Sequence, residues 1–96
     1  ALKWLRESAN QGNYLAQCQL GSMYLVGDGV MQNSSEAFKW FRKSAEQGFG
    51  GAQFALGYMY EYGDGVDVSI VEAKKWYRKA AEQGNEHAIE ALNRLD

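Results

Sequence analysis

The sequence predicts an all-α protein built as an antiparallel helix-pair solenoid, and three observations predict it. A phrase of 36 residues repeats along the 96-residue chain, and such a period is typical of stacked repeat architectures. Each copy carries two stretches whose apolar residues follow helical spacing. Short glycine-containing links join these stretches, which favours antiparallel packing of neighbouring helices. We therefore expect one continuous, elongated domain.

The repeat emerges when the chain is aligned with itself at an offset of 36 residues. Residues 1–36 and 37–72 are identical at 19 of 36 aligned positions, and residues 37–60 and 73–96 at 12 of 24. This predicts a single solenoid domain over residues 1–96, divided at the repeat boundaries. We expect a partial repeat at 1–12, full repeats at 13–48 and 49–84, and a C-terminal helix at 85–96.

One helical pattern, here called the second-type helix because it closes each repeat, is expected at 1–11, 34–47 and 70–83. Its small and apolar residues recur at the spacing i, i+3, i+4, i+7, i+8, which defines one buried face. Asn33 with Glu36 and Ser69 with Glu72 have the spacing of capping boxes. The tryptophans share one phase of the apolar stripe, so we expect them in the core, with their indoles stacked between repeats: Trp4, Trp40 and Trp76.

The other pattern, the first-type helix, is expected at 14–26, 51–62 and 86–95. Gly21 and Gly57 lie in the middle of it, where glycine costs about 1 kcal/mol relative to alanine. We expect close helix approach at these two positions to offset that cost. Asn13 and Asn85, which are favourable N-cap residues, precede two of these helices. The aromatic residue Phe49 precedes the middle one, which should therefore begin loosely.

The two ends of the chain differ in character. The second-type helix at 1–11 has no first-type partner, and stacked repeats cannot bury their faces alone. We expect a fragment of a longer solenoid, or self-association through this open N-terminal face. At the other end, the polar residues Asn93, Arg94 and Asp96 replace the glycine and tyrosines of the preceding copy. Polar replacements suit a capping helix, so we expect the solenoid to end near Asp96.

Composition excludes several classes of protein. The net charge of −2 argues against a nucleic-acid binder, which would carry a basic excess. No apolar run approaches the roughly 20 residues of a membrane span. The single cysteine, Cys18, forms no intrachain disulfide, so redox compartment stays open. No secretory signal opens the sequence, and the localisation is left unknown.

A search for reactive groups among the residues is mostly negative. His87 is the one histidine, with no second histidine or cysteine to share a metal. Cys18 has no histidine or basic residue within one helical turn, so we expect a small, half-buried apolar residue. Each Gly-Asp-Gly turn offers a single carboxylate, too few for calcium. We expect no catalytic residue, no cofactor and no metal.

The repeated unit A-x-x-W-[FY]-R-K-[SA]-A-E-Q-G, followed by A-Q-x-x-L-G-x-M-Y-x-x-G-D-G-V, resembles the Sel1-like repeat, a relative of the tetratricopeptide repeat. The resemblance covers essentially the whole chain. It implies a right-handed superhelix whose concave face holds a protein or peptide, and an adaptor role in bacterial envelopes, secretion, host interaction or the endoplasmic reticulum. Some disulfide-rich members are associated with β-lactams, but no serine here stands in a Ser-x-x-Lys pattern.

The face that changes between copies is the candidate binding surface. Positions 18, 22, 25 and 26 differ from their copies at 54, 58, 61 and 62, and become Glu90 and Arg94 in the last helix. Their spacing defines one helical face, part of which must pack on the next repeat. We expect the remainder to form a groove centred on Tyr58 and Tyr62. The candidate partner-binding residues are Gln17, Cys18, Ser22, Gln53, Phe54, Tyr58, Glu61 and Tyr62.

Three functions are compatible with this pattern. The first is a non-catalytic scaffold or adaptor that binds a protein or peptide on its concave face, because the repeated residues have a structural explanation and the chemistry search is empty. The second is an enzyme, a cell-wall or β-lactam hydrolase by family association, although it would need a nucleophile and a base in one cleft. The third is a purely structural spacer within a longer array.

Overall fold

The computed structural model describes residues 2–96 as six α-helices joined by short links. No strand occurs within that range, so the predicted all-α class is confirmed. The predicted start of the first helix at Ala1 lies outside the described residues. The helices are α1 (Leu2–Asn10), α2 (Tyr14–Val26), α3 (Ser34–Glu46), α4 (Gly50–Tyr62), α5 (Ile70–Glu82) and α6 (Glu86–Leu95).

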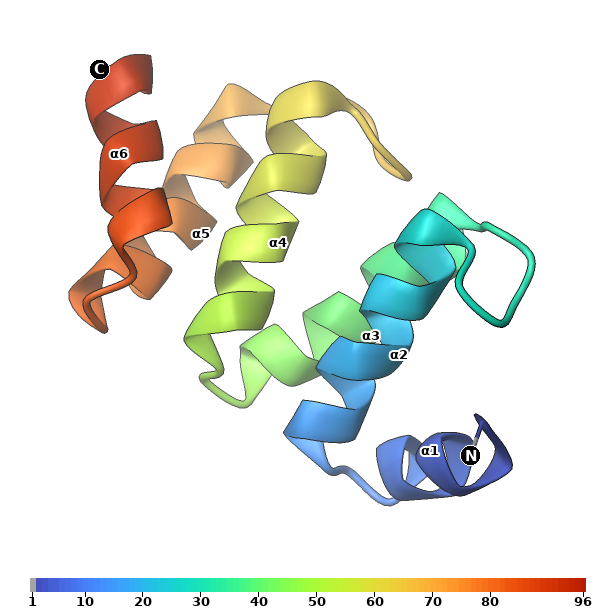
Figure 1. Ribbon diagram of the computed structural model, residues 1–96. Coiled ribbons are helices and arrows are strands. Elements are labelled where there is room, and N and C mark those ends of the chain that lie inside the picture. The colour runs from blue at the N-terminus through green and yellow to red at the C-terminus, as the bar shows by residue number, and fades with distance from the viewer. Residues whose placement is uncertain (1) are drawn as a thin grey trace.

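The helices follow one another as a solenoid. In Figure 1 the first-type helices α2, α4 and α6 lie toward the viewer, and the second-type helices α3 and α5 lie behind them. Each helix packs mainly against its neighbours in the chain, α1 on α2, α2 on α3, and so on to α6. The molecule measures 41 × 24 × 16 Å. This elongated form with local packing confirms the predicted helix-pair solenoid.

The N-caps follow the prediction in part. The side chains of Asn13, Asn33, Ser69 and Asn85 each accept a hydrogen bond from the backbone N–H three residues later, while Phe49 makes no side-chain cap. A full capping box also requires the glutamate side chain to accept a hydrogen bond from the backbone N–H of the cap residue, and this half of the prediction is wrong. The backbone N–H groups of the two second-type caps donate instead to the preceding first-type helix, Asn33 to Tyr24 O at 2.8 Å and Ser69 to Tyr60 O at 2.9 Å.

Two buried clusters form the core. The larger one spans α1 to α4 and includes Leu20, Phe41 and Leu56. The smaller one joins α5 to α6 around Tyr77 and Ala88. Because α4 contributes partly buried aromatic residues to this second cluster, the two cores are bridged through α4, and that helix is held from both sides.

The predicted tryptophan core is wrong in two of its parts. Trp40 is buried, with 8% of its surface exposed, but Trp76 is half-buried and Trp4 is 69% exposed. Among the aromatic pairs recorded for residues 2–96, none joins two indoles. Trp40 lies on α3, which packs on the preceding helix α2, whereas α1 has no first-type helix before it in the described chain. Repetition of a residue therefore did not guarantee repetition of its environment.

Candidate functional site

A groove lies between α4 and α6, where the first-type helices present their changing faces. It encloses a cavity of about 210 Å³ that opens to solvent. Five of its residues are aromatic or heteroaromatic side chains, and two carry charge at the α6 edge. We call this surface the tyrosine groove; its residues are Phe54, Tyr58, Tyr62, Tyr77, His87, Glu90, Ala91 and Arg94.

Tyr58 and Tyr62 form the exposed aromatic wall of the groove. They lie one turn apart on α4, and their ring centroids are 4.8 Å apart with an interplanar angle of 49°. Their exposed fractions, 42% and 57%, are large for tyrosines that touch each other. Paired rings held on a helix offer contact area at low entropic cost, a property that interaction surfaces use repeatedly.

Phe54 forms the floor of the groove. It is half-buried, and its ring centroid lies 5.6 Å from that of Tyr77 and 5.8 Å from that of His87. Tyr77 is fully buried on α5, whereas His87 is exposed on the first turn of α6. The aromatic floor therefore continues from the core to the surface without a break.

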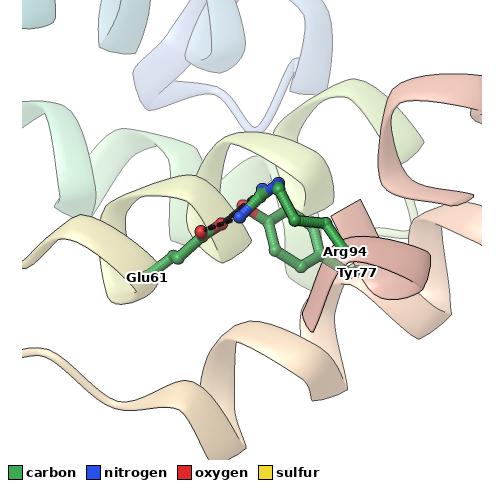
Figure 2. A network of polar contacts seen from close by, with 3 residues as sticks. All are labelled: Glu61, Tyr77 and Arg94. Carbon is green, nitrogen blue, oxygen red and sulfur yellow. Dashed lines mark hydrogen bonds and ion pairs between the residues drawn. The ribbon is translucent and has the colours of Figure 1, made fainter. Parts of the chain in front are cut away.

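A polar network of Glu61 on α4, Tyr77 on α5 and Arg94 on α6 links these helices (Figure 2). The Arg94 guanidinium donates to both carboxylate oxygens of Glu61, with Nη2 3.1 Å from Oε1. The Tyr77 hydroxyl donates to the same Oε1 at 2.8 Å. Such bidentate, charge-assisted pairs are geometrically specific. The network thus fixes the width of the groove by tying its two helices together.

Glu61 was a candidate partner contact, and the structure gives it this packing role instead. Its side chain is only 6% exposed. The hydrogen bond from Arg94 lowers the pKa of Glu61, against the opposing effect of its burial, and the Tyr77 hydroxyl lowers it further. Burial, together with the neighbouring carboxylate, raises the pKa of Tyr77. The sequence had shown the residue as variable, and the variation reflects inter-repeat pairing with Arg94.

Gln17 and Gln53 were also candidate partner-binding residues, and both are buried. The Gln53 amide donates to Ala45 O at 3.3 Å, and its oxygen accepts from Gln83 Nε2 at 2.9 Å. Gln17 repeats this arrangement with the corresponding residues of the preceding copy, at 3.0 and 2.8 Å. Their amides are therefore hydrogen-bonded between consecutive helices.

The repeat matches a known protein family. The model of the Sel1 repeat matches residues 1–13, 15–49 and 50–85. The chain belongs to the Sel1 repeat family. No curated protein matches the sequence significantly.

Solved Sel1 repeat proteins share this architecture. A Sel1 repeat protein from Oxalobacter formigenes superposes with a TM-score of 0.95 at 45% identity, over 97% of this chain and 70% of that one. The protective antigen c5321 of uropathogenic Escherichia coli strains, which displays an SLR fold, gives 0.95 at 43% identity, over 96% of this chain and 20% of the antigen. Cysteine rich protein B of Helicobacter pylori gives 0.88 at 24% identity, over 94% and 68%, a likeness of fold alone.

Sel1 repeats are commonly scaffolds for protein interaction and are generally non-catalytic. Within residues 2–96 no three histidine, cysteine or acidic side chains gather as a metal site. In the same range no helix has both the length and the apolar character to cross a bilayer. The groove between α4 and α6 is one of the surfaces of this Sel1 array where aromatic rings, charges and a cavity coincide; another lies between α3, α4 and α5.

The candidate residues of the first copy lie away from this groove, on α2. Ser22 is exposed there, and Cys18 is half-buried against the larger core cluster. Burial raises the pKa of the Cys18 thiol, which agrees with the expectation of a packing residue and disfavours a reactive thiolate. The structure therefore joins Phe54, Tyr58 and Tyr62 in one site and leaves Cys18 and Ser22 outside it.

Several groove residues were not among the sequence-based candidates. Glu90 and Arg94 occupy the aligned positions of Phe54 and Tyr58, and that alignment was the available signal for them. His87 was expected at the surface, where it lies, but its contact with Phe54 has no signature in the sequence. Tyr77 serves both the core and the groove floor.

The open N-terminal face carries a second apolar cluster. Trp4 and Leu15 are exposed there, and Trp4 joins Leu2, Leu5, Gln19 and Met23 around a cavity of about 230 Å³. This is the face that lacks a preceding first-type helix in the described chain. Self-association through it stays a prediction, which sedimentation velocity over a range of concentrations would test.

Proposed function

We propose that this chain is a non-catalytic scaffold that binds a peptide or protein segment in the tyrosine groove, on the concave side of its solenoid. The observation that carries the proposal is the exposed Tyr58–Tyr62 ring pair, which stands at the mouth of a cavity rather than in the core. Tyrosine is enriched among the residues that dominate binding energy at interfaces.

Rigidity of the groove supports the same function. The Glu61–Arg94–Tyr77 network and the Phe54–Tyr77 contact hold both walls in place without a ligand. A surface that is already ordered loses less conformational entropy when a partner binds. The rings therefore need no rearrangement to present their faces.

The repeat alignment supports this location further. The glycines that end the first-type helices and those that allow close helix contacts recur between copies, whereas Phe54, Tyr58 and Tyr62 replace Cys18, Ser22 and Val26. A face that does not repeat is not required by the packing common to every copy. Phe54 packs on buried Tyr77, so we attribute the two exposed rings, Tyr58 and Tyr62, to recognition.

Replacement of the two tyrosines tests the proposal. Peptides selected by display on the 96-residue chain should bind the Tyr58→Ala/Tyr62→Ala variant more weakly by about 2 kcal/mol or more, as hot spots do. The variant should keep its helical circular dichroism, because both rings are largely exposed. Tyr14→Ala is the matched control: Tyr14 is similarly exposed but lies on α2, outside the groove. Equal losses for the control, or global unfolding of the double variant, would remove the groove from the proposal.

The non-catalytic part of the proposal has its own test. A hydrolase needs a nucleophile activated by a neighbouring base, and the groove holds a histidine without a serine or cysteine beside it. Incubation with a chromogenic β-lactam should give no turnover above the uncatalysed rate. Sustained turnover that follows the protein through purification would favour the enzyme hypothesis instead.

A further inference from the structure

We propose that the tyrosine groove recognises an arginine side chain of the bound segment, with its guanidinium stacked on the Tyr58–Tyr62 ring pair and its donors directed to the carboxylate of Glu90. The inference rests on the proposed function, because it names the chemistry of the partner that the groove would take. Three observations carry it: the charge left uncompensated at the α6 edge, the unoccupied faces of the tyrosine rings, and the engagement of Arg94.

The charges around the groove do not cancel. Arg94 and Glu61 form an internal bidentate pair, so together they present little net charge to a ligand. Glu90 lies four residues before Arg94 on α6, a spacing that allows an ion pair on a helix, but Arg94 reaches across to α4 instead. Across residues 2–96 no ion pair of Glu90 is recorded. The groove therefore offers a cation an exposed carboxylate.

The tyrosine rings lack a cation of their own. Elsewhere the protein places one over an aromatic ring, with Arg6 5.7 Å from the centroid of Tyr24 and Lys43 4.9 Å from that of Trp40. In the described part of the chain no such cation lies over Tyr58 or Tyr62. The negative face of an aromatic ring attracts a cation, so the ring faces that do not contact the other tyrosine are available to a partner.

Arginine fits this arrangement better than lysine or an acidic residue. Its planar guanidinium stacks on an aromatic face while its fork of donors meets a carboxylate. Lysine is a compact, strongly hydrated charge that does only the second of these well. An acidic side chain would need Arg94, whose guanidinium is already bound to both oxygens of a nearly buried Glu61.

Selection of random heptapeptides on the intact chain tests the inference. The pool that binds this protein but not the Tyr58→Ala/Tyr62→Ala variant should be enriched in arginine. For the best peptide, the Glu90→Gln variant should bind about tenfold more weakly, and an arginine-to-glutamine change in the peptide should remove that difference. Glu86→Gln is the matched control, because Glu86 is exposed on the same helix but lies outside the groove.

The outcomes separate this inference from the proposed function. Peptides that depend on the tyrosines but lack arginine, or that ignore Glu90→Gln, would overturn the arginine assignment and leave the groove as a binding site. Failure to select any tyrosine-dependent peptide would overturn both. Selection repeated on the Glu90→Arg variant gives a further check, since the arginine enrichment should disappear.

Discussion

Gly57 faces the ring of Tyr77 so closely that a Cβ atom on Gly57 would lie 2.5 Å from the Cδ1 atom of Tyr77. The expected reason for a glycine in the middle of a helix is thereby confirmed, because α4 and α5 approach more closely there than any side chain would allow. Gly21 repeats the relationship less tightly, with its Cβ position 3.1 Å from the Phe41 ring. The aromatic residues that follow Trp40 and Trp76 thus pack on the glycine of the preceding helix.

Replacing Gly57 with alanine should destabilise the protein, although alanine is the better helix former. The propensity gain is about 1 kcal/mol, whereas forcing a methyl group into a packed site costs about 1–3 kcal/mol. Tyr77 is buried and hydrogen-bonded to Glu61, so its ring has little room to retreat. Urea unfolding should therefore show a net loss of stability for Gly57→Ala.

Gly21→Ala provides the graded comparison for that experiment. Its neighbour, the Phe41 ring, needs to move by only a few tenths of an ångström. The loss of unfolding free energy should therefore be smaller and close to zero. A Gly57→Ala protein at least as stable as the unmodified chain would show that the Tyr77 ring relaxes freely, and the close-approach explanation would then be wrong.

The tryptophans offer a test at two equivalent repeat positions. Trp40→Ala should cost about 3–5 kcal/mol, the usual range for truncation of a buried aromatic residue, because Trp40 is buried between helices. Trp4→Ala should stay within about 0.5 kcal/mol, as surface substitutions usually do. Chemical denaturation of the two variants measures the difference. Equal losses would mean that the Trp4 face is covered in solution.

The sequence predicted the helices well because the signals for them are local. Six helices lie within a few residues of their expected ranges, since apolar spacing and cap residues such as Asn13 act over one or two turns. The glycine stops at Gly27 and Gly63 adopt the left-handed conformation that the turns required. The repeat alignment then supplied the order of packing without any long-range information.

The candidate site was predicted less completely because it depends on pairs of residues from different helices. Tyr58 and Tyr62 were found from their variation between copies, and the structure places their rings together. Glu61 belonged to the same variable set, but its partner Arg94 lies 33 residues away, and no local pattern links the two. Gln17 and Gln53 repeat in sequence, which is the mark of a structural position, and both are buried as hydrogen-bonded links.

These glutamine links should contribute measurably to stability. Gln53→Ala would remove the donor to Ala45 O and the acceptor of Gln83 Nε2. Both partners keep another hydrogen bond, because Ala45 O also accepts from the Gly48 N–H at 2.9 Å and Gln83 Nε2 also donates to Gly48 O at 2.8 Å. The loss is therefore that of an ordinary hydrogen bond, about 0.5–1.5 kcal/mol. We expect a loss in that range by urea unfolding, and a similar one for Gln17→Ala, since the same contacts occur there.

A double-mutant cycle separates the link from general packing. If Gln53 and Gln83 act together, the Gln53→Ala/Gln83→Ala variant should lose less than the sum of the two single losses, with a coupling of at least about 0.5 kcal/mol. Gln19→Ala, on the exposed face of α2, is the control and should change stability little. Strict additivity of the two losses would show that the hydrogen bond makes no contribution of its own.

Stability should depend on pH through Glu61, and the sign follows from the lowered pKa of its carboxyl group in the folded protein. An unfolded glutamate has a pKa of about 4.3, so between that value and the lower folded pKa the unfolded chain binds more protons. Folding stability then rises with pH in this window. The contribution is therefore complete above the unfolded pKa and is lost as pH falls through the folded pKa. Urea midpoints of the unmodified chain and Glu61→Gln should differ at pH 7 and converge on acidification below about pH 4.

Arg94→Gln provides the second arm of this pH experiment. The hydrogen bond from Arg94 is the largest cause of the lowered Glu61 pKa, so removing it should shrink the acid-dependent part of the stability even with the carboxylate present. Comparing each variant with the unmodified chain cancels the effects of the other carboxyl groups. A difference between the unmodified chain and Glu61→Gln that stays constant from pH 7 to pH 3, or widens, would contradict the assignment of a stabilising charged pair between α4 and α6.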